Sequence, residues 1–320
     1  MINFLKKHLP PRVKQIIKKL IKKQLGSKPV VEQVVSPAPT LSVTSEPEIT
    51  NNSELNETIT AAPELAQNAK FINSHEGEEC FVLGNGPSLK RVNLDKLKDK
   101  FVITVNRFTK VTGYEKVHSN IHILVDVAYF DSNNLLGEEE LNKIWEDIEK
   151  MKIPVFVPLV AKNYINNKEL EKKIDIHYLD ILVNEIPDRF GTPLKIDILK
   201  PINSYTNVIQ FAIVLAINMG FKKINLIGCD ATSIYAILNA AEENKDIEIH
   251  GYENDNAKDI YKKLMNKMKL AESLFWESFN FLGYERLSEL CVQKGIKLIN
   301  LTDKSLIDSV PKEYCEDLYK

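Results

Sequence analysis

Cysteine is scarce in this sequence. The 320 residues include four cysteines, which lie far apart and form no C-x-x-C pair: Cys80, Cys229, Cys291 and Cys315. Neither a disulfide framework nor a zinc knuckle is therefore indicated. A chain of this composition is expected in a reducing compartment such as the cytosol.

Long apolar runs are also absent. No segment reaches the roughly 18 apolar residues of a membrane-spanning helix. Lys6 and Lys7 interrupt the apolar start of the chain, where a secretion signal would need an unbroken run. The sequence therefore predicts a chain that is neither secreted nor integral to a membrane.

Acidic residues are missing from residues 1–25, which are rich in lysine. In the segment RVKQIIKKLIKKQL, apolar residues recur every three to four positions and lysines occupy the opposite face, so the pattern predicts a basic amphipathic helix. Such a helix can lie in the surface of an anionic membrane. We expect residues 2–25 to hold the protein peripherally on the inner face of the cytoplasmic membrane. Docking on a protein partner and simple solubilisation of the terminus are the alternatives.

Aromatic residues are absent from residues 26–69, where Pro, Ser, Thr, Glu and Asn predominate. A segment of this composition cannot bury a core, so a disordered linker is predicted. The expected organisation is a basic amphipathic helix over 1–25, a linker over 26–69 and a catalytic domain over 70–320.

From residue 70 onward, short apolar runs alternate with longer helical patterns. Continuous apolar runs bounded by turns are typical of parallel strands that are buried on both faces. The order predicts an α/β domain with a Rossmann-like, open, mostly parallel sheet flanked by helices. The expected strands cover 80–83, 101–105, 121–125, 155–159, 224–227 and 296–301, and the expected helices cover 138–151, 207–219 and about 256–294, with Gly283 as a candidate break.

Polar residues follow three of the predicted strands: Gly84-Asn85-Gly86, Asn106, and Asp230 in Gly228-Cys229-Asp230. Ligands of open α/β sheets bind beyond the carboxyl ends of the strands. The glycines would let backbone N–H groups approach a phosphate, and the amide between them offers a donor and an acceptor to a phosphate or ribose. A tight turn with an Asx hydrogen bond is the alternative for this loop.

Common nucleotide and metal motifs are missing. Leu89 stands where the third glycine of G-x-G-x-x-G would be, and no G-x-x-x-x-G-K-[ST] occurs, so NAD and P-loop chemistry are disfavoured. There is no Asp-x-Asp triplet. His118 and His122 are spaced i, i+4, but the second opens a predicted strand, so no metal site is expected. The segment KKLMNKMK is predicted to be a solvated helix face and not a nucleic-acid site.

Two kinds of side chain are candidates for chemistry. His250 follows a short β-like run and precedes a glycine, and it suits a general base because imidazole titrates near neutral pH. Tyr235 and Tyr252 are phenols near the same strand ends and are candidates to hydrogen-bond a leaving phosphate. A solvated or capping loop histidine and half-buried structural tyrosines are the alternatives.

Five segments together carry a resemblance to known proteins: VLGNGPSLK, TVNRF, MGFKKINLIGCDAT, HGYENDN and GIKLINLTDKSLIDSVPK. They resemble the bacterial family called 6-hydroxymethylpterin diphosphokinase MptE-like, whose relatives include surface-polysaccharide proteins and motility-associated flagellin glycosyltransferases. The first, second and fourth are more distantly similar to the CMP-dependent family 42 sialyltransferases, which have Gly-Asn-Gly-Pro-Ser after the first strand and a catalytic histidine late in the chain. The resemblance runs from about Cys80 to Lys312.

The similarity to those sialyltransferases implies roles for individual residues. His250 would take the proton from the acceptor hydroxyl, and Tyr235 would bind the departing phosphate. Because CMP carries a single phosphate, no metal cofactor is expected. After His250 the chain departs from that family, so different surroundings of the acceptor are expected. The implied nucleotide-binding residues, around the phosphate and ribose of CMP, are Gly84, Asn85, Gly86, Pro87, Ser88, Asn106 and Asp230.

The predicted function is that of an inverting glycosyltransferase of bacterial surface-glycan assembly. Its donor would be a CMP-activated acidic sugar of the nonulosonic or sialic-acid kind, and its acceptor a glycan or glycolipid such as lipopolysaccharide. One alternative is the MptE-like diphosphokinase activity, which transfers pyrophosphate from ATP and would need Mg²⁺ at Asp126 and Asp230. The other is a non-catalytic nucleotide-binding scaffold in which His250 has no role.

Overall fold

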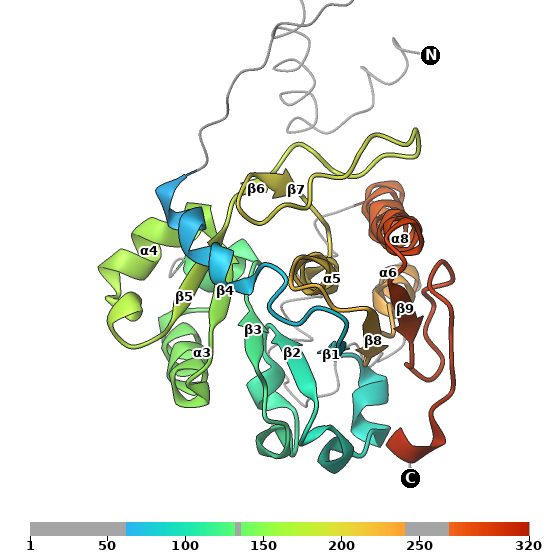
Figure 1. Ribbon diagram of the computed structural model, residues 1–320, viewed down its shortest axis with the longest axis horizontal. Helices are drawn as coiled ribbons and strands as arrows, with labels where there is room; N and C mark the ends of the chain where they lie inside the picture. The colour runs from blue at the N-terminus through green and yellow to red at the C-terminus, as the bar shows by residue number, and fades with distance from the viewer. Residues whose placement is uncertain (1–61, 132–135, 241–268, 320) are drawn as a thin grey trace, which may run out of the picture. The chain divides into compact units, whose positions relative to one another are not determined.

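The computed structural model describes residues 62–131, 136–240 and 269–319 (Figure 1). All described residues belong to one unit of the chain, Thr58–Lys320. The predicted basic helix and His250 lie outside the described residues. Within the described part of the chain, no helix combines the length and the apolar character needed to cross a membrane.

A seven-stranded parallel sheet forms the centre of the domain, in the order β5-β4-β3-β2-β1-β8-β9. The chain runs outward from β1 to β5 and then returns to the other side of β1 with β8 and β9. The predicted fold class, a Rossmann-like α/β sheet flanked by helices, is confirmed. The strands are β1 (Glu79–Leu83), β2 (Phe101–Val105), β3 (Ile121–Ile123), β4 (Val155–Pro158), β5 (Ile176–Leu179), β8 (Lys223–Ile227) and β9 (Lys297–Asn300).

The helices lie on both faces of this sheet (Figure 1). One face of the central strands packs against α5 and α8, and the other face packs against short 3-10 helices. The α-helices are α3 (Glu138–Met151), α4 (Lys162–Asn167), α5 (Val208–Asn218), α6 (Ser233–Ala240) and α8 (Leu270–Gln293). The 3-10 helices are η1 (Pro63–Phe71), η2 (Pro87–Arg91), η3 (Leu94–Leu97), η4 (Phe108–Lys110), η5 (Tyr114–Lys116), η6 (Val127–Phe130), η7 (Leu159–Ala161), η8 (Leu170–Lys172) and η9 (Glu316–Leu318).

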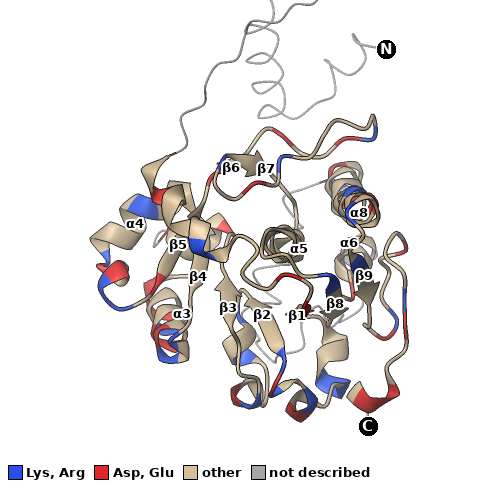
Figure 2. Cartoon of the chain, viewed as in Figure 1, with Lys and Arg blue, Asp and Glu red and all other residues tan. Residues whose placement is uncertain are grey.

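Helix α5 is buried on every side. All its residues from Ile209 to Ile217 are buried, and it carries no charged side chain, whereas α3 and α8 carry both signs of charge (Figure 2). A helix that is apolar all round belongs in a protein interior. Asn207 begins the helix, because its side chain accepts a hydrogen bond from the N–H of Ile209 at 2.9 Å. The central position of α5 fixes its N-terminal end beside the carboxyl edge of the sheet.

Helix α8 is continuous through Gly283, so the break that the sequence predicted there is wrong. A Cβ atom at position 283 would lie 2.6 Å from Nε2 of Gln210 on α5. The side chain of Gln210 is fully buried and donates to the carbonyl of Asn280 at 2.6 Å. The glycine therefore permits a close helix–helix approach and does not interrupt the helix.

The sequence missed several elements, among them helices α4 and α6. Strands β5, β6 (Ile181–Leu182) and β7 (Ile202–Asn203) were not predicted, and the last two pair in a small separate sheet. Most of helix η1 lies in the segment 26–69 that was assigned to the linker, yet its Asn68 is fully buried and donates to the carbonyls of Tyr178 and Ile198. The folded body therefore begins before residue 70.

Candidate active site

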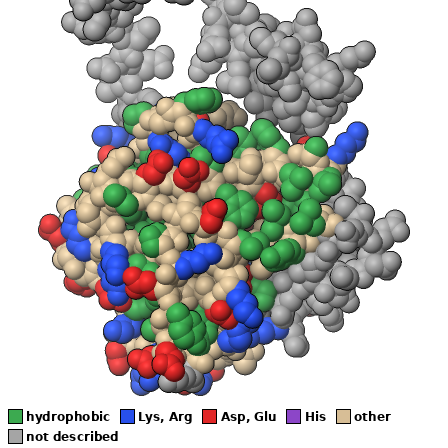
Figure 3. Space-filling model, turned by 90° about the vertical axis from the view of Figure 1, so that its right-hand side faces the viewer, with side chains coloured by type: hydrophobic (Ala, Val, Ile, Leu, Met, Phe, Trp, Pro, Cys, Tyr) green, Lys and Arg blue, Asp and Glu red, His purple; other side chains and the backbone are tan. Residues whose placement is uncertain are grey.

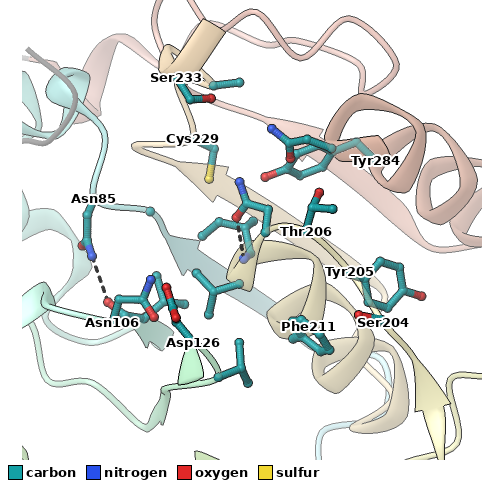
Figure 4. A pocket seen from close by; sticks show the side chains of 18 of the residues that line it. Asn85, Asn106, Asp126, Ser204, Tyr205, Thr206, Phe211, Cys229, Ser233 and Tyr284 are labelled. Carbon is teal, nitrogen blue, oxygen red and sulfur yellow. Dashed lines mark hydrogen bonds between the residues drawn. The ribbon is translucent and has the colours of Figure 1, made fainter. Parts of the chain in front are cut away.

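A cavity of about 680 Å³ opens at the carboxyl edge of the sheet, where the strand order reverses between β1 and β8 (Figure 4). Its walls come from the loops after β1, β2, β3, β4, β6 and β8, from the N-terminal ends of α5 and α6, and from one side of α8. The reversal point of an open parallel sheet is where ligands of such folds bind. The loops selected from the sequence as candidates, at Gly84-Asn85-Gly86, Asn106 and Asp230, lie at this edge.

The loops after β1 and β8 touch through their backbones. The N–H groups of Gly84 and Gly86 donate to the carbonyls of Ile227 and Gly228 at 2.8 and 2.9 Å. A Cβ atom at position 84 would lie 2.4 Å from the carbonyl oxygen of Gly228. A Cβ atom at position 86 would lie 2.0 Å from Oδ2 of Asp230. These glycines are thus required for contact between two strand ends, and their N–H groups are already engaged by the protein.

Ser88 and Asp230 close the same contact. The N–H of Ser88 donates to Oδ1 of Asp230 at 3.1 Å, and its hydroxyl donates to Oδ2 at 2.7 Å. Burial raises the pKa of the Asp230 carboxyl, and the two hydrogen bonds from Ser88 oppose that rise. Asp230 lines the cavity, whereas Ser88 and Pro87 do not. Roles of Pro87 and Ser88 at the nucleotide stay predictions.

Asn85 and Asn106 lie together on one wall (Figure 4). The amide of Asn85 donates to the carbonyl of Val105 at 2.9 Å and so connects the ends of β1 and β2. Asn106 has a left-handed backbone, with φ of 50°, a conformation that asparagine tolerates better than most residues. Ala231 lines the same cavity with φ of 56°. Backbone strain of this kind gathers at functional sites.

The N-terminal ends of α5 and α6 both reach the cavity, through Thr206 and Asn207 and through Thr232 and Ser233. The N-terminal end of a helix carries partial positive charge and favours anions. No lysine, arginine or histidine of the described ranges lines the cavity, whereas Asp126, Asp230 and Glu277 do. A bound anion would therefore be held by neutral donors and helix ends.

Helix α8 contributes a wall that the sequence did not identify as functional: Trp276, Glu277, Asn280 and Tyr284. Tyr284 is only 1 % exposed, and its hydroxyl points into the cavity (Figure 4). Burial raises the pKa of this phenol well above its ordinary value, so the hydroxyl remains a donor at neutral pH. Asn280 donates to Oε2 of Glu277 at 3.1 Å. The i, i+3, i+7 spacing of the last three was visible in the sequence, but nothing local showed what that face meets.

Of the candidate catalytic residues, the structure describes Tyr235, and the roles of all three stay predictions. Tyr235 lies on α6, is 46 % exposed and does not line the cavity. His250 and Tyr252 lie outside the described residues. His122 lies in β3 and is fully buried. Within the described ranges, no group of three or more His, Cys, Asp or Glu side chains is placed to hold a metal ion.

The fold is that of a Rossmann-like α/β protein, and a cavity lies at its strand reversal point. The chain belongs to the family called 6-hydroxymethylpterin diphosphokinase MptE-like, whose sequence pattern matches residues 49–234. No curated protein matches the chain. A solved structure of the sialyltransferase CstII from Campylobacter jejuni, in complex with a substrate analogue, cytidine-5'-monophosphate, is similar with a TM-score of 0.43 and 14 % identity over 76 % of this chain and 87 % of that chain.

Proposed function

We propose that this protein is a transferase that binds a nucleotide-activated substrate in the cavity between β1 and β8. In its specific form, the proposal is an inverting glycosyltransferase of surface-glycan assembly that uses a CMP-activated acidic sugar. Membership of a family named for a transferase supports the general class. The Gly-Asn-Gly-Pro-Ser loop, with its resemblance to CMP-dependent enzymes, is the basis for the donor.

One observation carries the proposal. Three strand-end motifs that the sequence singled out separately, Gly84-Asn85-Gly86, Asn106 and Asp230, line a single cavity. A volume of about 680 Å³ falls within the range of pockets that hold small ligands. Hydrogen bonds between the loops after β1 and β8 account for their contact with each other but not for the open space that they line together with Asn106, and this shared opening supports a common ligand.

The polar groups of the cavity suit a nucleotide whose ribose lies against one wall and whose phosphate lies against the other. The amides of Asn85 and Asn106 can bind ribose hydroxyls on one wall. The helix ends at Thr206 and Ser233 and the hydroxyl of Tyr284 offer neutral donors to a phosphate on the other. In this arrangement Tyr284 and not the exposed Tyr235 is the phenol that can reach the phosphate. The proposed base is His250, outside the described residues.

The diphosphokinase alternative follows from the family's name, and it would need Mg²⁺ between carboxylates. Both oxygens of Asp230 already accept hydrogen bonds from Ser88, and Oδ1 of Asp126 accepts one from the N–H of Ala128 at 2.9 Å. Each carboxylate keeps further lone pairs, so these bonds do not decide between the two reactions, and nucleotide binding with and without Mg²⁺ separates them.

Calorimetric titration of the full-length protein with CMP, CDP, UDP, GDP and ATP, with and without Mg²⁺, tests this function. We expect CMP to bind most tightly and Mg²⁺ to make no difference. Binding of ATP only with Mg²⁺ would replace the proposal by the diphosphokinase, and no binding of any nucleotide would contradict it. If CMP binds, His250→Ala should retain that binding and lose release of CMP from a CMP-sugar.

A further inference from the structure

Four exposed apolar side chains border the cavity, and each comes from a different segment. Val127 follows β3, Val160 follows β4, Val183 follows β6, and Trp276 lies on α8. The three valines are 66, 69 and 68 % exposed, and Trp276 is 39 % exposed. We call these four residues the apolar rim. Isolated exposed valines are ordinary on protein surfaces, but their gathering around one opening is not.

The rim continues along α8. The ring of Trp276 lies 5.9 Å from that of Phe275 and 6.1 Å from that of Phe279, and Phe275 is itself exposed. Leu270 and Leu274 of the same helix are exposed as well. Figure 3 shows hydrophobic side chains gathered on the side of the molecule that carries α8. The opening of the cavity thus adjoins an apolar surface.

The chemistry of the rim points to hydrocarbon and not to sugar. Valine side chains have no polar atom, so they cannot hydrogen-bond the hydroxyls of a soluble glycan, whereas hydrocarbon needs no such partner. Tryptophan, with its apolar body and single N–H donor, favours the boundary between lipid and water. The same chain carries the predicted basic helix over residues 2–25, which would supply attraction to anionic headgroups.

We propose that the apolar rim inserts into the acyl region of an anionic lipid bilayer, so that the cavity opens at the membrane surface. The inference rests on the proposed function, because a transferase with a lipid-linked acceptor must bring its donor site to the membrane. It adds to the predicted helix a second contact, made by the catalytic body at the edge of its site.

Fluorescence of Trp276 reports this contact directly. The chain has two tryptophans, and the other, Trp145 of α3, is 4 % exposed and packs in a core cluster. Full-length protein is mixed with phosphatidylglycerol vesicles that contain acyl-brominated phosphatidylcholine, and quenching is measured with Trp276→Phe as the blank. We expect quenching of the Trp276 signal by at least twofold, because bromine quenches only within the bilayer.

A triple variant and a matched control make the test specific. Val127→Ser, Val160→Ser and Val183→Ser together should abolish the quenching, whereas Val292→Ser, a 75 % exposed valine that does not line the cavity, should retain it. Sedimentation with vesicles without quenching would show that the predicted helix alone binds lipid, and absence of sedimentation would show no lipid contact; both overturn the inference. Calorimetric titration of the unsubstituted protein with CMP is independent of lipid, so absence of quenching leaves the nucleotide proposal standing.

Discussion

The hydroxyl of Ser88 donates to the carboxylate of Asp230 at 2.7 Å, across 142 residues of sequence, and so fastens the loop after β1 to the loop after β8. Both residues were candidate nucleotide ligands. In the structure they bind each other, and Ser88 is fully buried beneath the cavity. Hydrogen bonds to a charged acceptor contribute about 1.5–3 kcal/mol to stability, more than most neutral ones.

Ser88→Ala should therefore lower the free energy of unfolding by about 2 kcal/mol, because it leaves a buried carboxylate oxygen without its donor. Urea denaturation measures the effect. Ser119→Ala is the control, since the hydroxyl of Ser119 is buried and has no partner in the described structure, and its removal should cost less than about 0.5 kcal/mol. Equal effects of the two substitutions would mean that the hydrogen bond between Ser88 and Asp230 does not stabilise the domain.

Gly86→Ala should destabilise the domain by about 2–4 kcal/mol, because the new methyl group would overlap Oδ2 of Asp230 and the carbonyl of Gly228. Gly295→Ala separates this steric effect from backbone strain. Gly295 has φ of +64° and open space around it, so alanine there should cost only about 1–2 kcal/mol. Thermal unfolding measures the loss of stability in both variants. A smaller loss for Gly86→Ala than for Gly295→Ala would contradict the steric role of Gly86.

Gly283→Ala should destabilise the domain, although helix propensity alone would predict that it stabilises it. Alanine in a helix interior normally stabilises by about 1 kcal/mol relative to glycine. Here the methyl group would displace the buried amide of Gln210 from its bond to Asn280, so we expect a loss of about 1–3 kcal/mol. Chemical denaturation gives the sign. A stabilised variant would mean that α5 and α8 do not approach as closely as described.

His122 is expected to make the domain sensitive to mild acid. Burial lowers its pKa from the usual 6.5 to about 4, so the folded state keeps the ring neutral while the unfolded chain protonates it. The unfolded state therefore binds more protons between these values, and stability is present above pH 6.5 and is lost as the pH falls toward 4. The loss should reach about 3 kcal/mol near the lower value.

Urea unfolding at several pH values between about 7.5 and 4.5 measures this slope. In His122→Asn, whose amide can still bond to the hydroxyl of Thr104, the slope should become shallower. His177, with a pKa also lowered to about 4 by burial, is present in both proteins, so the difference isolates His122. Parallel curves for the two proteins would exclude this assignment.

Asn106→Gly tests the ligand wall without straining the backbone, because glycine adopts the left-handed conformation of Asn106 freely. We expect CMP affinity to fall by about tenfold, the value of one lost hydrogen bond, and stability to change by less than about 1 kcal/mol. Calorimetric titration and thermal unfolding report the two quantities. Unchanged affinity with lowered stability would make Asn106 a structural residue only.

The sequence alone determined the class of fold and the edge at which the site lies. Strands β1, β2 and β8 were predicted within a residue or so, because a strand buried on both faces is written as one continuous apolar run. Asn85, Asn106 and Asp230 were selected as candidate binding residues because each follows closely after a continuous apolar run. Helix α5 was also predicted, with Asn207 at its start.

Only the tertiary structure decided what the individual residues do. Gly86 was interpreted as part of a phosphate loop and Gly283 as a helix break. In the structure both positions need glycine because a distant residue, Asp230 or Gln210, lies where a Cβ atom would be. Tyr284 faces the cavity while Tyr235 is exposed. Periodicity and turn chemistry are local and can be read from neighbouring residues, whereas close approach and cavity walls depend on which distant segments pack together, and one sequence does not contain that information.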